Sequence, residues 1–514
     1  MAIAKYNVTT DNRLVNLIWV DGSSRVDYQY FGDVLAFDLT YRKNKYKRPV
    51  VIFSGSNNHK QTTIFGFGLL HDESLASYRW MLENLMEIMC RKKPSVVVTD
   101  GDKAMIKAVS EVLPELMHQL CAWHVEKNVT SNVKDDDLRG LFIRWLYVDM
   151  TTDVFESEWE QAAEDYGLCQ KQWWCQMYEK KEMWASAYLR DKFCAGYRTT
   201  SRCEGINAYV NKFSKSTHTI LELVQCLDMV AREYRNKEML LQFKSINSVP
   251  VMTTCLRSLE RHAASVYTRE VFGDVRKEIE EVGALILIST KRIMNTMIYT
   301  LEEYKDPDVH IMSSFGQSTR KLSYQCNFWK KQGYPCKHMF FVIKAEHLKE
   351  IPEEIVLRRW RTDAKSVEQY IENWGDYSER GVIMRHGALH SASQWLFFLG
   401  AQRLSMFQKT MRGIESLCKE LEMDCRAFGS SMRRNEEKVG EGNPMVRDPV
   451  VAKAKGAPKL PTKKHLGKRR RCTCCKGIGH NKRNCPEKGD NRQNPNQADE
   501  CGGINGPGLM SNDD

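Results

Sequence analysis

Two aspartates end short apolar segments near the start of this 514-residue chain, and they constrain what it can fold into. Asp38 follows Val34-Leu-Ala-Phe, and Asp100 follows Val96-Val-Val-Thr. Apolar and β-branched runs of this length favour buried strands. A carboxylate at such a place is costly unless it binds a metal ion or a hydrogen-bond partner. We therefore expect both carboxylates at strand ends of one domain, where they can share metal ions.

A third acid would complete the set that two-metal phosphodiester chemistry requires. Glu204 lies in Thr199-Thr-Ser-Arg-Cys-Glu204-Gly-Ile-Asn207, and with Asp38 and Asp100 it offers carboxylate oxygens to Mg²⁺. A solvated glutamate on a helix surface is the alternative interpretation of Glu204. Glu158 is the runner-up for its role. Asp102, which precedes a helix-forming segment, is expected to be only a helix N-cap.

Residues 30–130 alternate strand and helix signals. The first three expected strands are joined by polar links, as in an antiparallel meander, and the fourth follows a helix. That order is typical of an α/β sheet of ribonuclease-H type. The strands are expected at 33–41, 48–54, 62–70 and 95–99, and the helices near 75–91 and 102–112.

Short segments between about Asn12 and Lys365 match one known family. They are 33–46, 65–70, Trp80, 99–100 with 104–105, 121–124, 201–207, 267–272, 351–352, 358–360 and 364–365. Through them the chain resembles Mutator-like transposases, and most closely the plant far-red-impaired-response proteins, which are transposase-derived regulators of transcription. The resemblance implies a ribonuclease-H-like core, Asp38, Asp100 and Glu204 as the ancestral catalytic set, and a role in light-controlled development.

The chain is expected to divide into a core and several accessory regions. Five tryptophans between Val125 and Thr199 are expected to pack a helical insertion. The expected regions are an N-terminal lead-in (1–30), a ribonuclease-H-like core (31–130 and 200–220), a helical insertion (131–199), a helical region (221–310), a SWIM-like zinc unit (311–350), a second helical region (351–430), a basic linker (431–471), a zinc knuckle (472–486) and a disordered tail (487–514).

The first zinc candidate is Cys326-x9-Cys336-x-His338. The resembling family has a SWIM-type zinc site here, with a further Cys where this chain has Tyr324. Three ligands do not close a structural zinc site, so either another side chain or water completes it, or the metal has been lost. Aromatic side chains can pack this small unit in either case; they are Tyr324, Phe328, Trp329, Phe340 and Phe341.

Cys121-x2-His124 also has a spacing at which two residues can share a metal ion. No second pair of ligands stands nearby in the sequence. The resembling family carries this pair beside its second aspartate. We expect local packing and hydrogen bonding rather than metal binding.

The C-terminal motif Cys472-x2-Cys475-x4-His480-x4-Cys485 has the four ligands and the spacing of a zinc knuckle. The segment is too short and too polar to fold without metal, so Zn²⁺ is expected here. Knuckles bind single-stranded nucleic acid or proteins. This one carries Thr473 and Ile478 in place of an aromatic stacking platform, so nucleic-acid specificity from this element alone is not expected.

The chain's net charge of +11 is concentrated in its C-terminal part. Twelve Lys or Arg and no Asp or Glu lie between Val451 and Cys485, which leaves the rest near neutral. Such clusters gain affinity for nucleic acid by releasing counterions, and they also serve as nuclear-localisation signals. We expect a nuclear protein that reaches DNA directly or through a partner, by way of Lys463, Lys464, Lys468, Arg469, Arg470 and Arg471.

Other features limit the class of protein. The sequence has no apolar run of membrane-spanning length and no signal-peptide pattern, so we expect a soluble intracellular protein without a membrane partner. Seventeen cysteines suit a reducing compartment.

Apolar residues between Leu404 and Leu421 recur every three or four positions. They predict either a short dimer seam or an ordinary packed helix.

Three functions are compatible with these patterns. The first is a nuclear zinc protein, derived from a transposase, that regulates transcription. The second is an active transposase that cuts and joins DNA with Mg²⁺, which the retained acids favour. The third is a truncated modulator that forms oligomers with full-length relatives. Met1 lies only 37 residues before Asp38, so we expect the DNA-recognition module of longer family members to be missing. The altered SWIM ligand favours the first function, for which catalysis is not expected.

Overall fold

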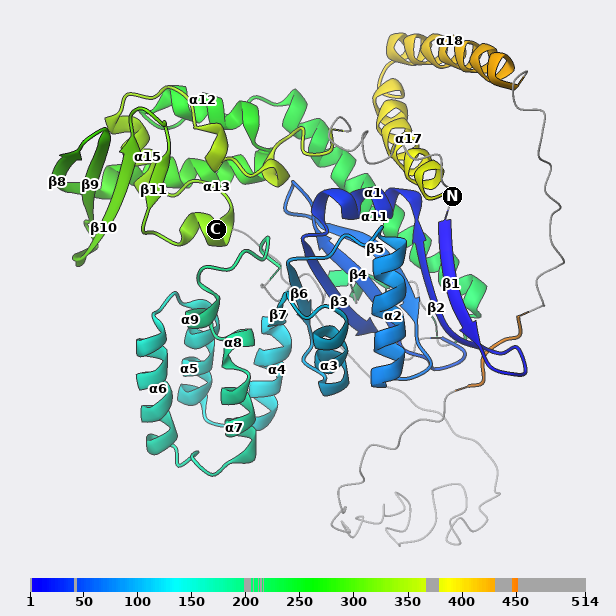
Figure 1. The fold of residues 1–514 in the computed structure, drawn as a ribbon, viewed down its shortest axis with the longest axis horizontal. Coiled ribbons are helices and arrows are strands. Elements are labelled where there is room, and N and C mark those ends of the chain that lie inside the picture. Colours follow the sequence, from blue (N-terminus) through cyan, green and yellow to red (C-terminus); the bar gives the residue numbers. More distant parts are fainter. Residues whose placement is uncertain are drawn as a thin grey trace, which may run out of the picture. The chain divides into compact units, whose positions relative to one another are not determined.

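A seven-stranded sheet forms the N-terminal part of the chain (Figure 1). The computed structural model describes residues 2–40, 44–197, 217–366, 379–429 and 446–451, with a few positions between 205 and 215. Residues 1–453 form one compact unit. Residues 454–514 form a second unit, which includes the basic cluster and the Cys472 motif. This unit lies outside the described residues.

The sheet has the strand order β1-β2-β5-β4-β3-β6-β7. Strands β3, β4 and β5 form an antiparallel meander, and β6 and β7 run parallel to β3. The four expected strands and two expected helices are confirmed; they are β3 (Val34–Thr40), β4 (Val50–Ser56), β5 (Thr62–Leu69), β6 (Val96–Thr99), α2 (Leu75–Ile88) and α3 (Lys103–Val112). The seventh strand, β7 (Met117–Leu120), follows α3.

The expected lead-in over residues 1–30 is instead part of this sheet. Strand β1 (Ala2–Val8) pairs with β2 (Leu14–Asp21), and β2 pairs with β5. Helix α1 (Gly22–Phe31) then packs against the sheet. Strand β1 alternates exposed and half-buried positions at the sheet edge, so its apolar signal is weak. The backbone hydrogen bonds of β1 with β2 hold the strand in the sheet although it has few buried apolar side chains.

The tryptophan-rich segment forms a helical layer, as expected. Phe142 lies at the centre of its core, and the rings of Trp159 and Trp174 stack with centroids 3.7 Å apart. Trp145 and Trp184 are fully buried. The helices are α4 (Ala122–Asn132), α5 (Asp136–Tyr147), α6 (Thr152–Asp165), α7 (Gln172–Glu179), α8 (Lys181–Trp184) and α9 (Ser186–Leu189).

The expectation that 221–310 is all helical is wrong beyond Ala284. A second, four-stranded antiparallel sheet begins there, with the order β11-β10-β9-β8. Tyr299 and Leu301 alternate with half-buried residues and are buried in the same core as α15, so the strand period was present in the sequence. The elements are α11 (Ile220–Asn247), α12 (Arg257–Val266), α13 (Arg269–Glu280), β8 (Leu285–Ile293), β9 (Thr296–Glu303), β10 (Asp306–Gly316), β11 (Leu322–Tyr324), α14 (Phe328–Gln332) and α15 (Lys337–Ala345).

Two further helices follow this sheet: α17 (Glu379–Gly400) and α18 (Leu404–Gly429). Helix α17 packs against α1. None of the helices in the described part of the chain is long and apolar enough to cross a membrane.

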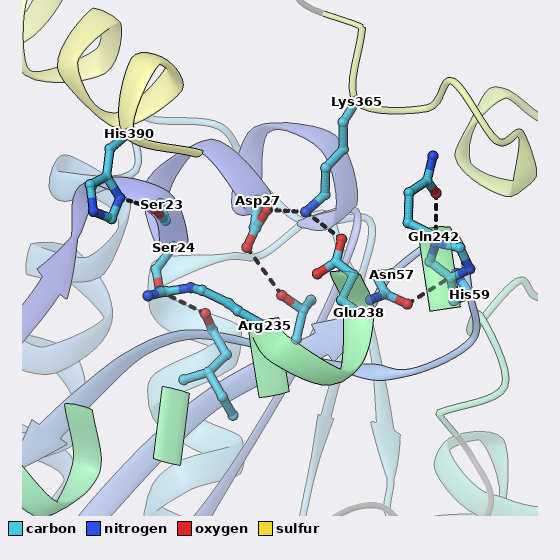
Figure 2. Close-up of polar contacts among 12 residues, drawn as sticks. Ser23, Ser24, Asp27, Asn57, His59, Arg235, Glu238, Gln242, Lys365 and His390 are labelled. Atoms are coloured by element: carbon cyan, nitrogen blue, oxygen red, sulfur yellow. Dashed lines mark hydrogen bonds and ion pairs between the residues drawn. The ribbon is translucent and has the colours of Figure 1, made fainter. Parts of the chain in front are cut away.

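A buried ion cluster joins three distant segments (Figure 2). The Lys365 Nζ lies 2.7 Å from Asp27 Oδ1 on α1 and 2.5 Å from Glu238 Oε1 on α11. The Asp27 side chain is 3% exposed and the Glu238 side chain 13%. Burial lowers the pKa of Lys365, but the two carboxylates outweigh it, and the net shift is upward. The lysine therefore stays charged and holds α1 and α11 against the segment that follows the second sheet.

Replacing Lys365 with Met should destabilise the folded protein. The change leaves two carboxylates buried with one cation fewer, which costs about 3 kcal/mol. We expect a lower midpoint in urea denaturation followed by tryptophan fluorescence. Lys107→Met, an exposed lysine on α3, is the matched control and should leave the midpoint unchanged. Equal midpoints for the two variants would show that the cluster contributes nothing to stability.

Candidate functional site

Asp38 lies on β3, and Asp100 directly follows the neighbouring parallel strand β6. Strand β3 pairs with β6 so that Ala36 lies opposite Val98, and two residues further along each chain come the aspartates. Adjacent strands are about 4.8 Å apart. Ala36 and Val98 belong to one core cluster, and side chains two residues apart share a face. The structure therefore brings two of the three expected acids to one face of the sheet.

Backbone N–H groups and one imidazole contact these two carboxylates. Asp38 is 8% exposed, and its Oδ1 accepts a hydrogen bond from the Leu39 backbone N–H at 2.8 Å. Asp100 Oδ1 accepts one from the Asp102 N–H at 3.1 Å. His124 on α4 places Nε2 3.9 Å from Asp38 Oδ1. The site is thus a pair of partly buried carboxylates with one imidazole beside them.

The electrostatics of the pair favour a cation at this place. Burial raises the pKa of Asp100, which the Asp102 N–H and His124 offset only in part. Burial lowers the pKa of His124, but a hydrogen bond with Cys121 and the charge of Asp38 outweigh it, so the net shift is upward. Carboxylate oxygens are also the ligands that Mg²⁺ prefers. The two aspartates fit a divalent ion, and protonated His124 would compete with it.

The structure gives a different answer for each of the other three acids that the sequence suggested. Glu204 lies outside the described residues. Glu158 accepts hydrogen bonds from Arg144 and from Trp145 Nε1, both at 2.9 Å, so it serves the helical layer. Asp102 caps α3 through the backbone N–H groups of Ala104 and Met105, as expected.

Cys121 is buried in the core beside the aspartates. It is 2% exposed and is hydrogen-bonded with His124. It is not part of any group of three converging metal ligands in the segments that the structure describes. These observations agree with the expected packing and hydrogen-bonding role of the Cys121–His124 pair.

Cys326, Cys336 and His338 lie together as a group that could hold a metal ion. One ligand atom of each lies within 4.8 Å of the others. His338 is 2% exposed, and neither ring nitrogen has a hydrogen-bond partner. A buried polar atom without a partner is costly. The thiols and this imidazole are ligands that Zn²⁺ prefers, so a metal ion would satisfy the histidine.

The two thiols of this group are hydrogen-bonded to each other. A hydrogen bond with Cys336 lowers the pKa of Cys326, and the same contact raises the pKa of Cys336. The thiolate is the form that binds metal. The lowered pKa of Cys326 favours its thiolate form.

The sequence pattern did not predict the two carboxylates that lie next to this group. Glu303 on β9 lies 3.4 Å from His338 Nε2 through its Oε1. Glu278 on α13 accepts a hydrogen bond from the Lys337 N–H at 2.9 Å, and burial raises its pKa to about 7. Neither belongs to the Cys-x9-Cys-x-His spacing, so no local pattern identifies them. Neither carboxylate belongs to the group of converging ligand atoms, and the ring of Tyr324 packs 6.1 Å from that of Trp329.

Comparison with known proteins identifies the relatives of this chain. Residues 34–128 match the MULE transposase domain. The chain is 27% identical to Protein FAR-RED IMPAIRED RESPONSE 1 of Arabidopsis thaliana over 70% of its length and 44% of that protein. It is 26% identical to Protein FAR1-RELATED SEQUENCE 5 of the same plant, over 75% of the chain and 50% of that protein. The chain thus spans about half the length of these relatives.

Tyr324→Cys should strengthen metal binding at the Cys326 group. A third thiolate would complete four ligands, and we expect about tenfold tighter binding or more, because closed tetrahedral sites hold Zn²⁺ best. Competition with a chromophoric zinc chelator measures this. Every variant carries Cys472→Ser and Cys485→Ser, so that the C-terminal motif does not contribute.

Two controls accompany this measurement. Tyr6→Cys, an exposed position on β1, should leave the affinity unchanged. Cys336→Ser should abolish binding. Equal affinities for Tyr324→Cys and the parent would mean that residue 324 does not reach the metal.

Proposed function

Because this chain belongs to the far-red-impaired-response family, we propose that it is a transposase-derived nuclear zinc protein that regulates transcription in light-controlled development. The observation that carries the proposal is the similarity to these relatives over about seven-tenths of the chain. The name of the first relative refers to an impaired far-red response, and the light-dependent role is inferred from it.

The strand arrangement supports a core of ribonuclease-H type. An antiparallel meander, β3 to β5, is followed by two strands parallel to β3, in the order β5-β4-β3-β6-β7. In this proposal the sheet is an inherited nucleic-acid scaffold, and its first and fourth core strands carry Asp38 and Asp100. Regulation requires such a scaffold to bind partners or DNA, but it does not require cleavage.

A second function, metal-dependent DNA cleavage and strand transfer, is favoured by one observation. Asp38 and Asp100 remain aligned on adjacent strands with His124 beside them. They would hold Mg²⁺, whose chemistry at such a site is Lewis-acid activation of a phosphate and its attacking oxygen. The aspartates would position the ion and keep negative charge on that face, while His124 in its protonated form would oppose metal entry.

Zinc has a structural role in the proposed function. Cys326, Cys336 and His338 would hold one ion, with a carboxylate or water as the fourth ligand. That ion would link β11 to the start of α15. The motif at Cys472, Cys475, His480 and Cys485 would hold a second. The basic residues before it would serve nuclear import and contacts to DNA phosphates.

Asp38→Asn separates the two functions. For a regulator, the change should leave activation or repression of a light-responsive reporter in plant protoplasts unchanged. Purified protein with Mg²⁺ or Mn²⁺ should not nick supercoiled DNA, with or without the change. Asp136→Asn, an exposed aspartate on α5, is the control. Nicking by the parent that Asp38→Asn abolishes would establish the enzyme instead.

Nuclear import should depend on the basic cluster. Changing Lys468, Arg469, Arg470 and Arg471 to Ala should move a fluorescent fusion from the nucleus to the cytoplasm, because import receptors recognise the clustered charge. The control changes Lys103, Lys107, Lys291 and Arg292, four exposed basic residues of the folded part, and should remain nuclear. Nuclear accumulation of both fusions would contradict this role.

A further inference from the structure

A cavity of about 270 Å³ lies beside the ion cluster around Lys365. Its walls come from α1, α11, α17 and the segment that ends at Lys365. Figure 2 shows how Asp27, Glu238 and Lys365 meet at this place. Much of the remaining wall is apolar; the residues are Val26, Tyr30, Met239, Ala388, Ala392 and Trp395. The cavity thus has a charged end and an apolar side, as small-molecule sites in proteins commonly do.

The charged groups beside this cavity are one cation short in the described part of the chain. Asp21 lies 2.7 Å from Arg235, so a single lysine is left between Asp27 and Glu238. Burial raises the pKa of Asp27, Lys365 opposes that rise only in part, and the charge of Glu238 adds to it. A further positive charge in the cavity would therefore be attracted to these carboxylates.

Asn58 offers an uncharged acceptor to the same ligand. Its side chain lines the cavity, and the residue is 3% exposed. The Nδ2 group donates to the Arg361 carbonyl oxygen at 3.0 Å, whereas Oδ1 has no hydrogen-bond partner among the described residues. A buried acceptor without a partner is costly. An ammonium group carries three N–H donors and no acceptor, so it suits both the carboxylates and this oxygen.

The size and the walls of the cavity limit the rest of the ligand. A dry cavity of about 150 Å³ holds one benzene molecule, so about 270 Å³ admits an aromatic ring system with a short chain. Trp395 supplies a flat aromatic surface, and its ring stacks on that of Phe398 with centroids 5.6 Å apart. A planar ligand ring packs well against such a surface.

We propose that this cavity binds a small aromatic monoamine, in which a ring is carried on a short alkylammonium chain. The ammonium group binds at the end formed by Asp27 and Glu238, with Asn58 Oδ1 as a third acceptor. The ring packs against Trp395 and the alanines of α17. A bound amine would connect α17 to α1 and α11. This site goes beyond the proposed function and does not depend on it.

Tryptamine is the probe, in isothermal titration calorimetry with the full-length protein. It carries an ammonium group on a short chain from an indole ring, and tryptophol has a hydroxyl group in place of that ammonium. We expect tryptamine to bind about tenfold more tightly than tryptophol or better, because its charge meets carboxylates with little exposure. Indole-3-propionate, whose charge is negative, should not bind.

Two variants test the place of binding. Ala392→Phe leaves the ion pairs intact and puts a phenyl ring on the α17 wall, so it should abolish tryptamine binding. Asp27→Asn should weaken tryptamine binding by about tenfold or more and leave tryptophol binding unchanged. Glu233→Gln is the control, because this half-exposed acid on α11 lies outside the cavity and its replacement removes the same charge. The midpoint of urea denaturation shows whether each variant folds.

Three results would overturn the proposal. Equal affinities for tryptamine and tryptophol would mean that the carboxylates do not recognise the charge of the ligand. Tryptamine binding that persists in Ala392→Phe, with the urea midpoint of the parent, would take place elsewhere on the protein. A parent protein that does not bind tryptamine at millimolar concentration has no site for this class of ligand.

Discussion

The parallel pairing of β3 with β6 is the constraint on which the rest of the α/β part depends. Parallel neighbours need a crossover connection, and α2 covers the sheet within that connection. The pairing joins the antiparallel meander to β7 and to the helical layer that follows. It also sets the register that places Asp38 beside Asp100. A shift of one residue would turn one of the two carboxylates to the opposite face.

The ion cluster around Lys365 couples this sheet to the rest of the folded chain. Asp27 belongs to α1, Glu238 to α11, and Lys365 to the segment after the second sheet (Figure 2). Arg235 on α11 adds a second link, to Asp21 at 2.7 Å. Because charges with little exposure tolerate few alternative partners, these contacts define how the helices and the later segment meet.

The Cys326 group combines three converging side chains that could hold a metal ion with an aromatic surround. Tyr324 packs on Trp329, and Phe340 is fully buried. His338 stays in the core without a hydrogen-bond partner, as expected of a ligand rather than of a packing residue. The carboxyl groups of Glu278 and Glu303 lie near the same place. The aromatic packing and the ligand geometry are thus separable features of this unit.

The sequence by itself determined the local elements around Asp38 and Asp100, the helical packing of the tryptophans and the ligand spacing of the Cys326 group. Each of these signals depends on residues close together in the chain, whose periodicity reports which face is buried. Only the tertiary structure decided that β1 and β2 extend the sheet, that Glu278 and Glu303 flank His338, and that Lys365 lies between Asp27 and Glu238. It also decided that Leu404, Phe407, Met411 and Leu421 on α18 are exposed. A periodic pattern shows that a face is apolar, but what covers that face depends on segments far away in the sequence.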